Sequence, residues 1–320
     1  ADERRLFRSQ PGLANTRGFM LPVFAHASVR DMAWIAFSPP LLNDRLLPMR
    51  DPLQGSAWRD DPEQLLHALQ TLDQAPAALD ALLGESPDRR LGNYYERLWH
   101  ALLSLAPDTR ILAHNLALRD GAHTYGELDL IIEAADGAVV HLELAIKFYL
   151  ARPELHSTDS AVSDPAIWWG VDPRDNLASK LQRLREHQLP LAARLPELAT
   201  AHRALPLPDC SAAWLQGGLF QHLLRQVPPV EGQQPPAAPL HWCHQHELKS
   251  LAPTHRWQPM AHKAWLMPPE PESGADLDVH QMGRISERAG ERRAVMFCTA
   301  DQPPLASERL LCVGNNWPNG

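Results

Sequence analysis

The sequence contains no segment typical of a secreted, membrane or disulfide-rich protein. Its 320 residues include four cysteines without paired spacing, so a disulfide framework is not expected. No apolar run is long enough to span a membrane, and residues 1–18 lack the apolar core of a signal peptide. The chain begins at Ala1 instead of an initiator methionine, so we expect it to be processed or trimmed. These absences favour a cytoplasmic location.

An excess of positive charge is also missing. The net charge of −8 argues against a protein that coats nucleic acid non-specifically, although it leaves room for a local basic patch. The sequence has no GxSxG pattern, no Walker motif and no dinucleotide-binding glycine pattern, which disfavours serine hydrolases, NTPases and dehydrogenases. Thirty prolines predict long irregular connections between secondary-structure elements.

The strongest pattern lies between Gly126 and Leu150, GELDLIIEAADGAVVHLELAIKFYL. Apolar and polar residues alternate on both sides of a turn signal, which predicts two strands that each have one apolar and one polar face. The polar faces carry Glu127, Asp129, Glu133, His141, Glu143 and Lys147. Carboxylates of this kind can hold a divalent cation beside a phosphodiester.

The length of the turn decides whether these acids meet. A two-residue loop at Asp136-Gly137 would place Asp129 and Glu143 on opposite faces of the sheet. A three-residue loop pairs Ala134 with Ala138 and places Asp129 opposite Glu143. It also pairs the apolar residues consistently, Leu128 with Leu144 and Leu130 with Leu142. We therefore predict the three-residue loop.

The rest of the chain is predicted to divide into four parts. Residues 1–87 form a helical and loop-rich segment, with helical patterns around Val29–Trp34 and Pro62–Leu72. Residues 88–225 form the core, 226–239 a proline-rich linker, and 240–320 an α+β addition. Within the core we expect a helix at 92–103, a strand at 109–118, the hairpin, a loop at 168–170, a helix at 173–187 and a strand at 212–220. Short strands are expected at 263–267, 294–299 and 309–313, and an exposed segment at 268–275.

The order helix, three strands, helix, strand, with Glu96 on the first helix and Glu143 ahead of Lys147 on the third strand, resembles the PD-(D/E)XK nuclease superfamily. The stretches VRDMAWIAFSPPLL, LGNYYERLW, GELDLI and HLELAIKFYL are similar to a bacterial family of unknown function assigned to that superfamily. The resemblance implies an α/β fold: a restriction-endonuclease-like αβββαβ core with a mixed sheet, an N-terminal helical segment and a C-terminal β-containing addition.

The resemblance also implies a metal-dependent nuclease that hydrolyses phosphodiester bonds of DNA or RNA. Asp129 and Glu143 would hold Mg²⁺ or Mn²⁺, with help from Glu96 and from Glu127 as a further ligand. Lys147 would orient the attacking water or support the transition state. The superfamily usually has its lysine two residues after the acid, where this chain has Ala145. Lys147 lies about 6–7 Å further along the same face, within reach of a long side chain.

Nucleic acid is the expected partner, with Lys180 and Gln188 as candidate substrate-binding residues, and a protein partner is an alternative. Simpler interpretations remain open. The acidic residues can be the solvated face of a hairpin, and Glu96 an exposed helix residue paired with His100. Lys180, Arg183 and Arg185 can be a solvated helix face, and Gln188 a polar helix end.

Two further alternatives concern function. The chain can be a catalytically weakened member of the same fold that binds nucleic acid or a protein. The cluster His241-Trp242-Cys243-His244-Gln245-His246 is a rival metal site, although zinc usually takes ligands from two separated clusters and no second cluster follows.

Overall fold

The computed structural model describes residues 22–84, 90–120, 123–157, 159–198, 205–251, 256–269, 276–291 and 293–319. The chain forms two compact units. Unit 1 contains Ala1–Ile146 and Leu181–Gln216, and unit 2 contains Lys147–Lys180 and Gly217–Gly320. The limits predicted from the sequence do not coincide with these units, because two long strands pass from one unit to the other. As functional domains, the four predicted segments stay predictions.

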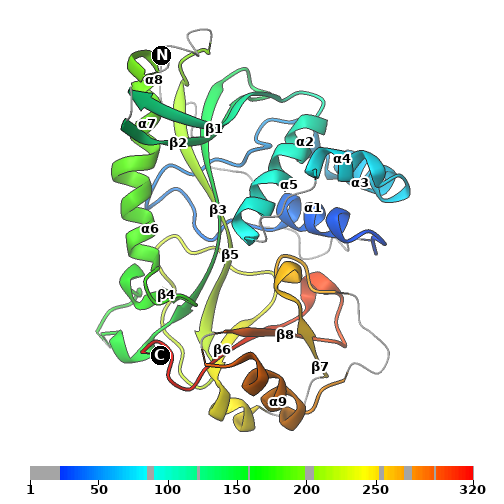
Figure 1. Cartoon of the computed structure of the whole chain (residues 1–320), viewed down its shortest axis with the longest axis vertical. Coiled ribbons are helices and arrows are strands. Elements are labelled where there is room, and N and C mark those ends of the chain that lie inside the picture. Colours follow the sequence, from blue (N-terminus) through cyan, green and yellow to red (C-terminus); the bar gives the residue numbers. More distant parts are fainter. Residues whose placement is uncertain are drawn as a thin grey trace. The chain divides into compact units, whose positions relative to one another are not determined.

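Unit 1 begins with the expected helical segment, drawn in blue and cyan in Figure 1. Its helices are α1 (Ala27–Phe37), α2 (Ala57–Asp60), α3 (Pro62–Gln74), α4 (Ala77–Leu83) and α5 (Leu91–Leu105). Asp61 caps α3 by accepting a hydrogen bond from the backbone N–H of Glu63, and Pro62 occupies the first helical position, where no N–H is needed. In α5 the predicted apolar stripe is buried, with Tyr95, Leu98 and Leu102 in the core.

The strands of unit 1 follow the predicted order. They are β1 (Arg110–Asp120), β2 (His123–Glu133), the first part of β3 (Val139–Ala151) and the first part of β5 (Cys210–His222). β1 pairs with β2 and β2 with β3, both antiparallel. Figure 1 shows α5 on one side of β1 and β2, and α7 (Leu189–Leu191) and α8 (Leu195–Leu198) on the other side.

The predicted helix at 173–187 is shorter and less regular than expected. α6 runs over Leu177–Arg183 and continues as a π-helical turn, Leu184–Gln188, before α7. It starts late because Asn176 caps its first turn by accepting a hydrogen bond from the backbone N–H of Ser179. π-turns inside helices are frequent at functional sites, and this one ends at Gln188.

Unit 2 contains β4 (Trp168–Gly170), β6 (Leu240–His244), β7 (Trp257–Met260), β8 (Val295–Thr299), β9 (Arg309–Val313) and α9 (Val279–Ala289). β6 lies parallel to both β5 and β9, whereas β8 is antiparallel to β9 and to β7. Short 3₁₀ turns occupy Pro153–Leu155, Pro165–Ile167, Gln245–Ser250, His262–Ala264 and Pro304–Ala306.

Two predictions in this part of the chain are wrong. Residues 168–170, expected as a loop, form β4 and pair with the end of β3. Residues 263–267, expected as a strand, instead begin inside the 3₁₀ turn His262–Ala264 and form no strand. The carbonyls of Trp265 and Leu266 accept hydrogen bonds from the Arg309 guanidinium, so they are satisfied by a side chain instead of a strand neighbour. The predicted exposed segment at 268–275 lies mostly outside the described residues.

The proline-rich segment 226–239, predicted as a linker, belongs to unit 2 over its whole length. Val227 and Val230 are buried. Val230 also forms a parallel bridge with Ser163. Composition predicted a solvated connection, but these two apolar side chains are buried in the protein.

The molecule is therefore a mixed α/β protein. Among the described residues the strands follow the order β1-β2-β3-β5-β6-β9-β8-β7, with β4 on β3, in one mixed sheet of nine strands. No helix in that part of the chain combines the length and the apolar character that crossing a membrane requires.

Candidate functional site

The hairpin between β2 and β3 has the predicted three-residue loop, Ala135-Asp136-Gly137. The backbone N–H of Ala134 donates to the carbonyl of Ala138 at 2.9 Å, and that of Gly137 donates to Ala134 at 2.8 Å. Gly137 adopts φ +81°, a conformation that glycine takes without strain. The pairing of Leu130 with Leu142 is confirmed as well. The predicted register is thus present between the loop and the pair Leu130–Leu142.

Beyond Leu130 and Leu142 the backbone ladder stops, contrary to prediction. The expected pairs of Leu128 with Leu144 and of Asp129 with Glu143 do not occur in the register of β2 and β3. Instead, the backbone N–H of Leu144 donates to Oδ2 of Asp129 at 3.0 Å. A side chain therefore replaces the backbone acceptor, and the Asp129 carboxylate is bound to the backbone of β3 at Leu144, the residue that follows Glu143 in the sequence.

Glu143 is almost completely buried, with 1% of its surface exposed, and so is its neighbour on the same strand, His141. Nε2 of His141 lies 3.1 Å from Oε1 of Glu143, and Nδ1 lies 3.0 Å from the hydroxyl of Ser211 on β5. The side-chain amide of Gln188 donates to Oε2 of Glu143. Both carboxylate oxygens of Glu143 thus accept hydrogen bonds, one from β3 and one from the end of the π-turn.

Burial lowers the pKa of His141 to about 4, and the nearby negative charge of Asp129 offsets only part of this shift. The imidazole is therefore neutral at pH 7, and its contact with Glu143 is a hydrogen bond instead of an ion pair. If the Glu143 carboxyl group is ionised it can only accept, and Nε2–H then faces Glu143 while Nδ1 accepts the Ser211 hydroxyl. The arrangement does not fit a solvated hairpin face at Glu143.

Glu127 lies on the same strand as Asp129 but in a different environment. It is exposed, and its Oε1 accepts a hydrogen bond from the side-chain amide of Asn115 on β1 at 3.2 Å. Glu96 is on α5 as predicted and is half-buried, next to Tyr95. Whether Glu96 and Glu127 bind metal remains a prediction.

Lys147 forms a contact that the sequence did not indicate. Its ammonium group donates to Oδ2 of Asp175 at 2.6 Å, and the hydroxyl of Tyr149 donates to Oδ1 of the same carboxylate at 3.3 Å. Lys147, Tyr149 and Asp175 all belong to unit 2. Lys180 is half-buried on α6, and its role in substrate binding stays a prediction.

Within the described residues, no group of three or more His, Cys, Asp or Glu side chains has the geometry of a metal site. Mg²⁺, however, usually takes only one or two protein carboxylates and keeps water or phosphate as its other ligands. Asp129 and Glu143 supply such a pair on neighbouring strands, with hard oxygen donors. The chemistry of these donors suits a hard cation such as Mg²⁺ or Mn²⁺, and binding of such an ion by Asp129 and Glu143 stays a prediction.

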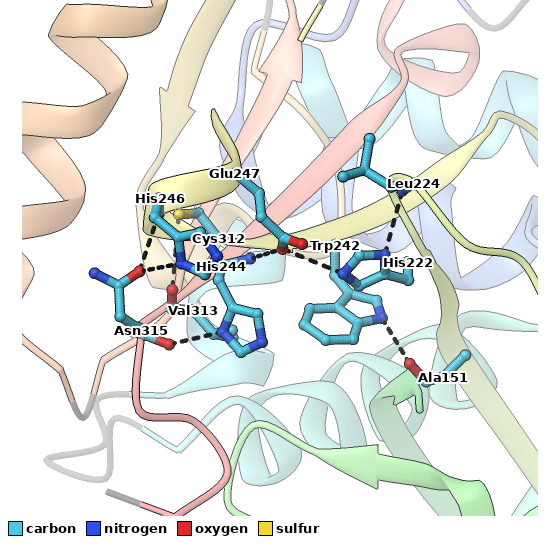
Figure 2. A network of polar contacts seen from close by, with 11 residues as sticks. Ala151, His222, Leu224, Trp242, His244, His246, Glu247, Cys312, Val313 and Asn315 are labelled. Atoms are coloured by element: carbon cyan, nitrogen blue, oxygen red, sulfur yellow. Dashed lines mark hydrogen bonds and ion pairs between the residues drawn. The ribbon is translucent and has the colours of Figure 1, made fainter. Parts of the chain in front are cut away.

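The rival histidine cluster is a hydrogen-bonded network in unit 2 (Figure 2). His222 accepts a hydrogen bond from the backbone N–H of Leu224 at Nδ1, so its Nε2–H donates to Glu247 at 3.2 Å. His244 and His246 stack with ring centroids 5.6 Å apart. Their Nδ1 atoms lie 3.0 Å and 2.9 Å from the oxygens of Gly314 and Asn315. These contacts hold the end of β6 against the chain after β9, which is a structural role.

Sequence reasoning missed three polar residues of the site: His141, Ser211 and Asn115. His141 shares the polar face of Glu143, which was a usable signal, since a strand places residues i and i+2 together. Ser211 and Asn115 come from other strands. The sequence around each of them gives no indication of a contact with the hairpin.

Fold and site together define a mixed α/β protein in which two neighbouring strands present a fixed pair of carboxylates. The model of a family described as a domain of unknown function (DUF1853) matches residues 30–309, and the chain belongs to this family. No curated protein matches the chain, and no solved structure does.

Proposed function

We propose that this protein is a metal-dependent nuclease that hydrolyses phosphodiester bonds of DNA or RNA on a restriction-endonuclease-like core. The observation that carries the proposal is the pair Asp129 and Glu143, whose carboxylates are fixed by hydrogen bonds directly beyond the Leu130–Leu142 pair. The order α5, β1, β2, β3, α6, β5 supports the same core, with β4 inserted after β3.

In this mechanism Asp129 and Glu143 would hold Mg²⁺ or Mn²⁺, which would supply a water of lowered pKa and stabilise charge on the phosphate. Leu144 N–H and the amide of Gln188 hold the two carboxylates in place. His141, being neutral, orients Glu143 without adding charge to the site. The resemblance to the nuclease superfamily assigns an assisting role to Glu96 on α5 and the orientation of the water to Lys147, and Lys180 is the candidate for contact with the phosphate backbone.

The ion pair between Lys147 and Asp175 favours a second candidate function. A lysine whose ammonium group is bound at 2.6 Å by a carboxylate is less available to a water or phosphate. The usual lysine position is Ala145. In this second proposal the chain is a catalytically weakened member of the fold that binds nucleic acid or a protein partner.

A cleavage screen distinguishes the two functions. Single- and double-stranded DNA and RNA are incubated with the full chain and Mg²⁺ or Mn²⁺, beside Asp129→Asn and Glu143→Gln. We expect cleavage by the unmodified protein and a loss of at least about 10³-fold in each variant, because each removes a charged ligand. Glu133→Gln on the same hairpin is the control, since Glu133 pairs with Arg110 in an exposed salt bridge.

Cleavage that survives unchanged in Asp129→Asn would contradict the nuclease. Absence of cleavage by the unmodified protein, with nucleic-acid affinity unaltered in both variants, would support the weakened binding protein. Mn²⁺ titration by calorimetry provides a measurement that does not depend on the choice of substrate.

A further inference from the structure

β1 contains an interruption directly opposite Asp129. His114 pairs with Leu130 and Leu116 with Leu128, so Asn115 is the position that faces Asp129 across the two strands. Asn115 has φ +48°, whereas residues of a regular strand have negative φ. Among non-glycine residues asparagine tolerates this left-handed conformation best, but in the middle of a strand it breaks the ladder.

The packing on both strands shows that the pleat reverses at this point. In a regular strand His114 and Leu116 would share one face. The ring of His114 instead lies 4.7 Å from that of His100 on α5, whereas Leu116 packs in the cluster around Leu191 and Leu195. α5 and these leucines lie on opposite sides of the strands (Figure 1).

The same reversal is visible on β2. Leu128 and Ile131 differ by an odd number of positions and would point to opposite faces of a regular strand. Both belong to the cluster of Leu191 and Leu195. The alternation therefore changes between Leu128 and Ile131, which is the stretch that contains Asp129.

We infer that Asn115 is a positioning residue: its left-handed backbone releases Asp129 from the regular ladder, so that the Asp129 carboxylate can accept the backbone N–H of Leu144. The side-chain amide of Asn115 also donates to Oε1 of Glu127 on β2 at 3.2 Å, and in this inference that contact is secondary to the backbone conformation. The consequence for metal binding rests on the proposed function, whereas the consequence for the Asp129–Leu144 hydrogen bond does not.

The test compares Asn115→Gly with Asn115→Ala in the full chain. Both remove the amide, but glycine adopts φ +48° freely and alanine does not. The measured quantities are amide hydrogen exchange at Leu144, followed by NMR, and Mn²⁺ affinity. Asp129→Ala gives the exchange rate expected when the acceptor is absent, and the amide of Val140, in the intact ladder, is the internal control.

We expect Asn115→Gly to keep Leu144 protection and to bind Mn²⁺ within about twofold of the unmodified protein. Asn115→Ala should expose Leu144 to exchange as Asp129→Ala does and lower Mn²⁺ affinity by about 10–100-fold, as loss of groups that orient metal ligands does. Unaltered Leu144 exchange in Asn115→Ala would overturn the inference. An equal loss of Leu144 protection in both variants would overturn it too. The side-chain amide of Asn115, and not its backbone conformation, would then be responsible.

Failure of the proposed function gives a different result. If the unmodified protein binds no Mn²⁺, the metal site is wrong, and Leu144 exchange alone decides the role of Asn115. If Asn115→Ala does not fold, Asn115→Gly still tests the inference, since loss of Leu144 protection there contradicts it.

Discussion

At the scale of single residues, the buried carboxylate of Glu143 is the feature that most needs an explanation. Burial of an ionised group costs several kcal/mol unless hydrogen bonds replace its water. Glu143 receives such bonds from His141 and Gln188, both neutral side chains. These two contacts fix the orientation of the Glu143 carboxyl group inside the protein.

Gln188→Ala tests this arrangement. Loss of the amide leaves Oε2 of Glu143 without this donor, so we expect the free energy of unfolding to fall by about 1–3 kcal/mol. We also expect Mn²⁺ affinity to fall by about 10–100-fold, because the carboxylate is no longer oriented. Urea denaturation and calorimetry measure the two effects.

Gln182→Ala is the matched control for Gln188→Ala. Gln182 is exposed on α6, and its side-chain amide donates to Oε2 of Glu186 at 3.1 Å. Its replacement should change the unfolding free energy by less than about 0.5 kcal/mol. An equal effect of the two variants would show that helix propensity, and not the contact with Glu143, is what matters.

At the same scale, the sequence predicted Asp129, Glu143 and Gln188 as site residues for definable reasons. Alternation placed the two acids on strand faces, and the turn residues fixed the register. Their hydrogen bonds could not be predicted, because Ser211 lies 70 residues from His141 and Gln188 lies 45 residues from Glu143. Asn115 was missed because a left-handed residue inside a strand leaves no periodic signal.

At the scale of elements, long patterns with clear boundaries were predicted well. α5 and β1–β3 follow the expected order, because an apolar stripe and a strict alternation each extend over several turns or pairs. The short strand β4 was predicted as a loop. Its three residues are too few for a period, and only pairing with β3 makes them a strand.

Two glycines test how closely the elements of unit 2 are packed. Gly217 on β5 has φ +129°, and a Cβ at this position would lie 1.8 Å from the carbonyl oxygen of Lys147. Gly217→Ala should therefore lower the free energy of unfolding by about 3 kcal/mol or more, since backbone must move. Denaturant unfolding measures the change.

Gly283, inside α9, is the contrasting position, because a Cβ there meets nothing within 4 Å. Gly283→Ala should raise the unfolding free energy by about 0.5–1 kcal/mol through helix propensity. Stabilisation by Gly217→Ala, or no difference between the two, would contradict the close approach of β5 to Lys147.

At the scale of the whole molecule, buried histidines predict a loss of stability in mild acid. Burial lowers the pKa of His100 and of His141 from 6.5 to about 4. Between these values the unfolded chain binds protons that the folded chain does not, so the free energy of unfolding falls as pH falls from 6.5 toward 4. Above pH 6.5 this contribution is fully present, and it amounts to at most about 3 kcal/mol for each histidine.

His100→Gln checks this linkage without touching Glu143. The variant lacks one of the two histidines that take up a proton when the chain unfolds. Its unfolding free energy should therefore depend less steeply on pH between 6.5 and 4. Urea denaturation at several pH values gives the slope, and exposed His187→Gln is the control for loss of an imidazole. An unaltered slope in His100→Gln would contradict the buried neutral state of His100.

The sequence by itself determined the hairpin, its three-residue loop and the register of β2 and β3 as far as the pair Leu130–Leu142. These depend on interactions between residues close in the chain, where side-chain period and turn preferences act. Tertiary structure decided where the ladder ends, which carboxylate is buried and which residues hold it. Those outcomes depend on contacts between segments far apart in the chain, as when Asn115 of β1 faces Asp129, or Ser211 of β5 meets His141, and no local pattern encodes them.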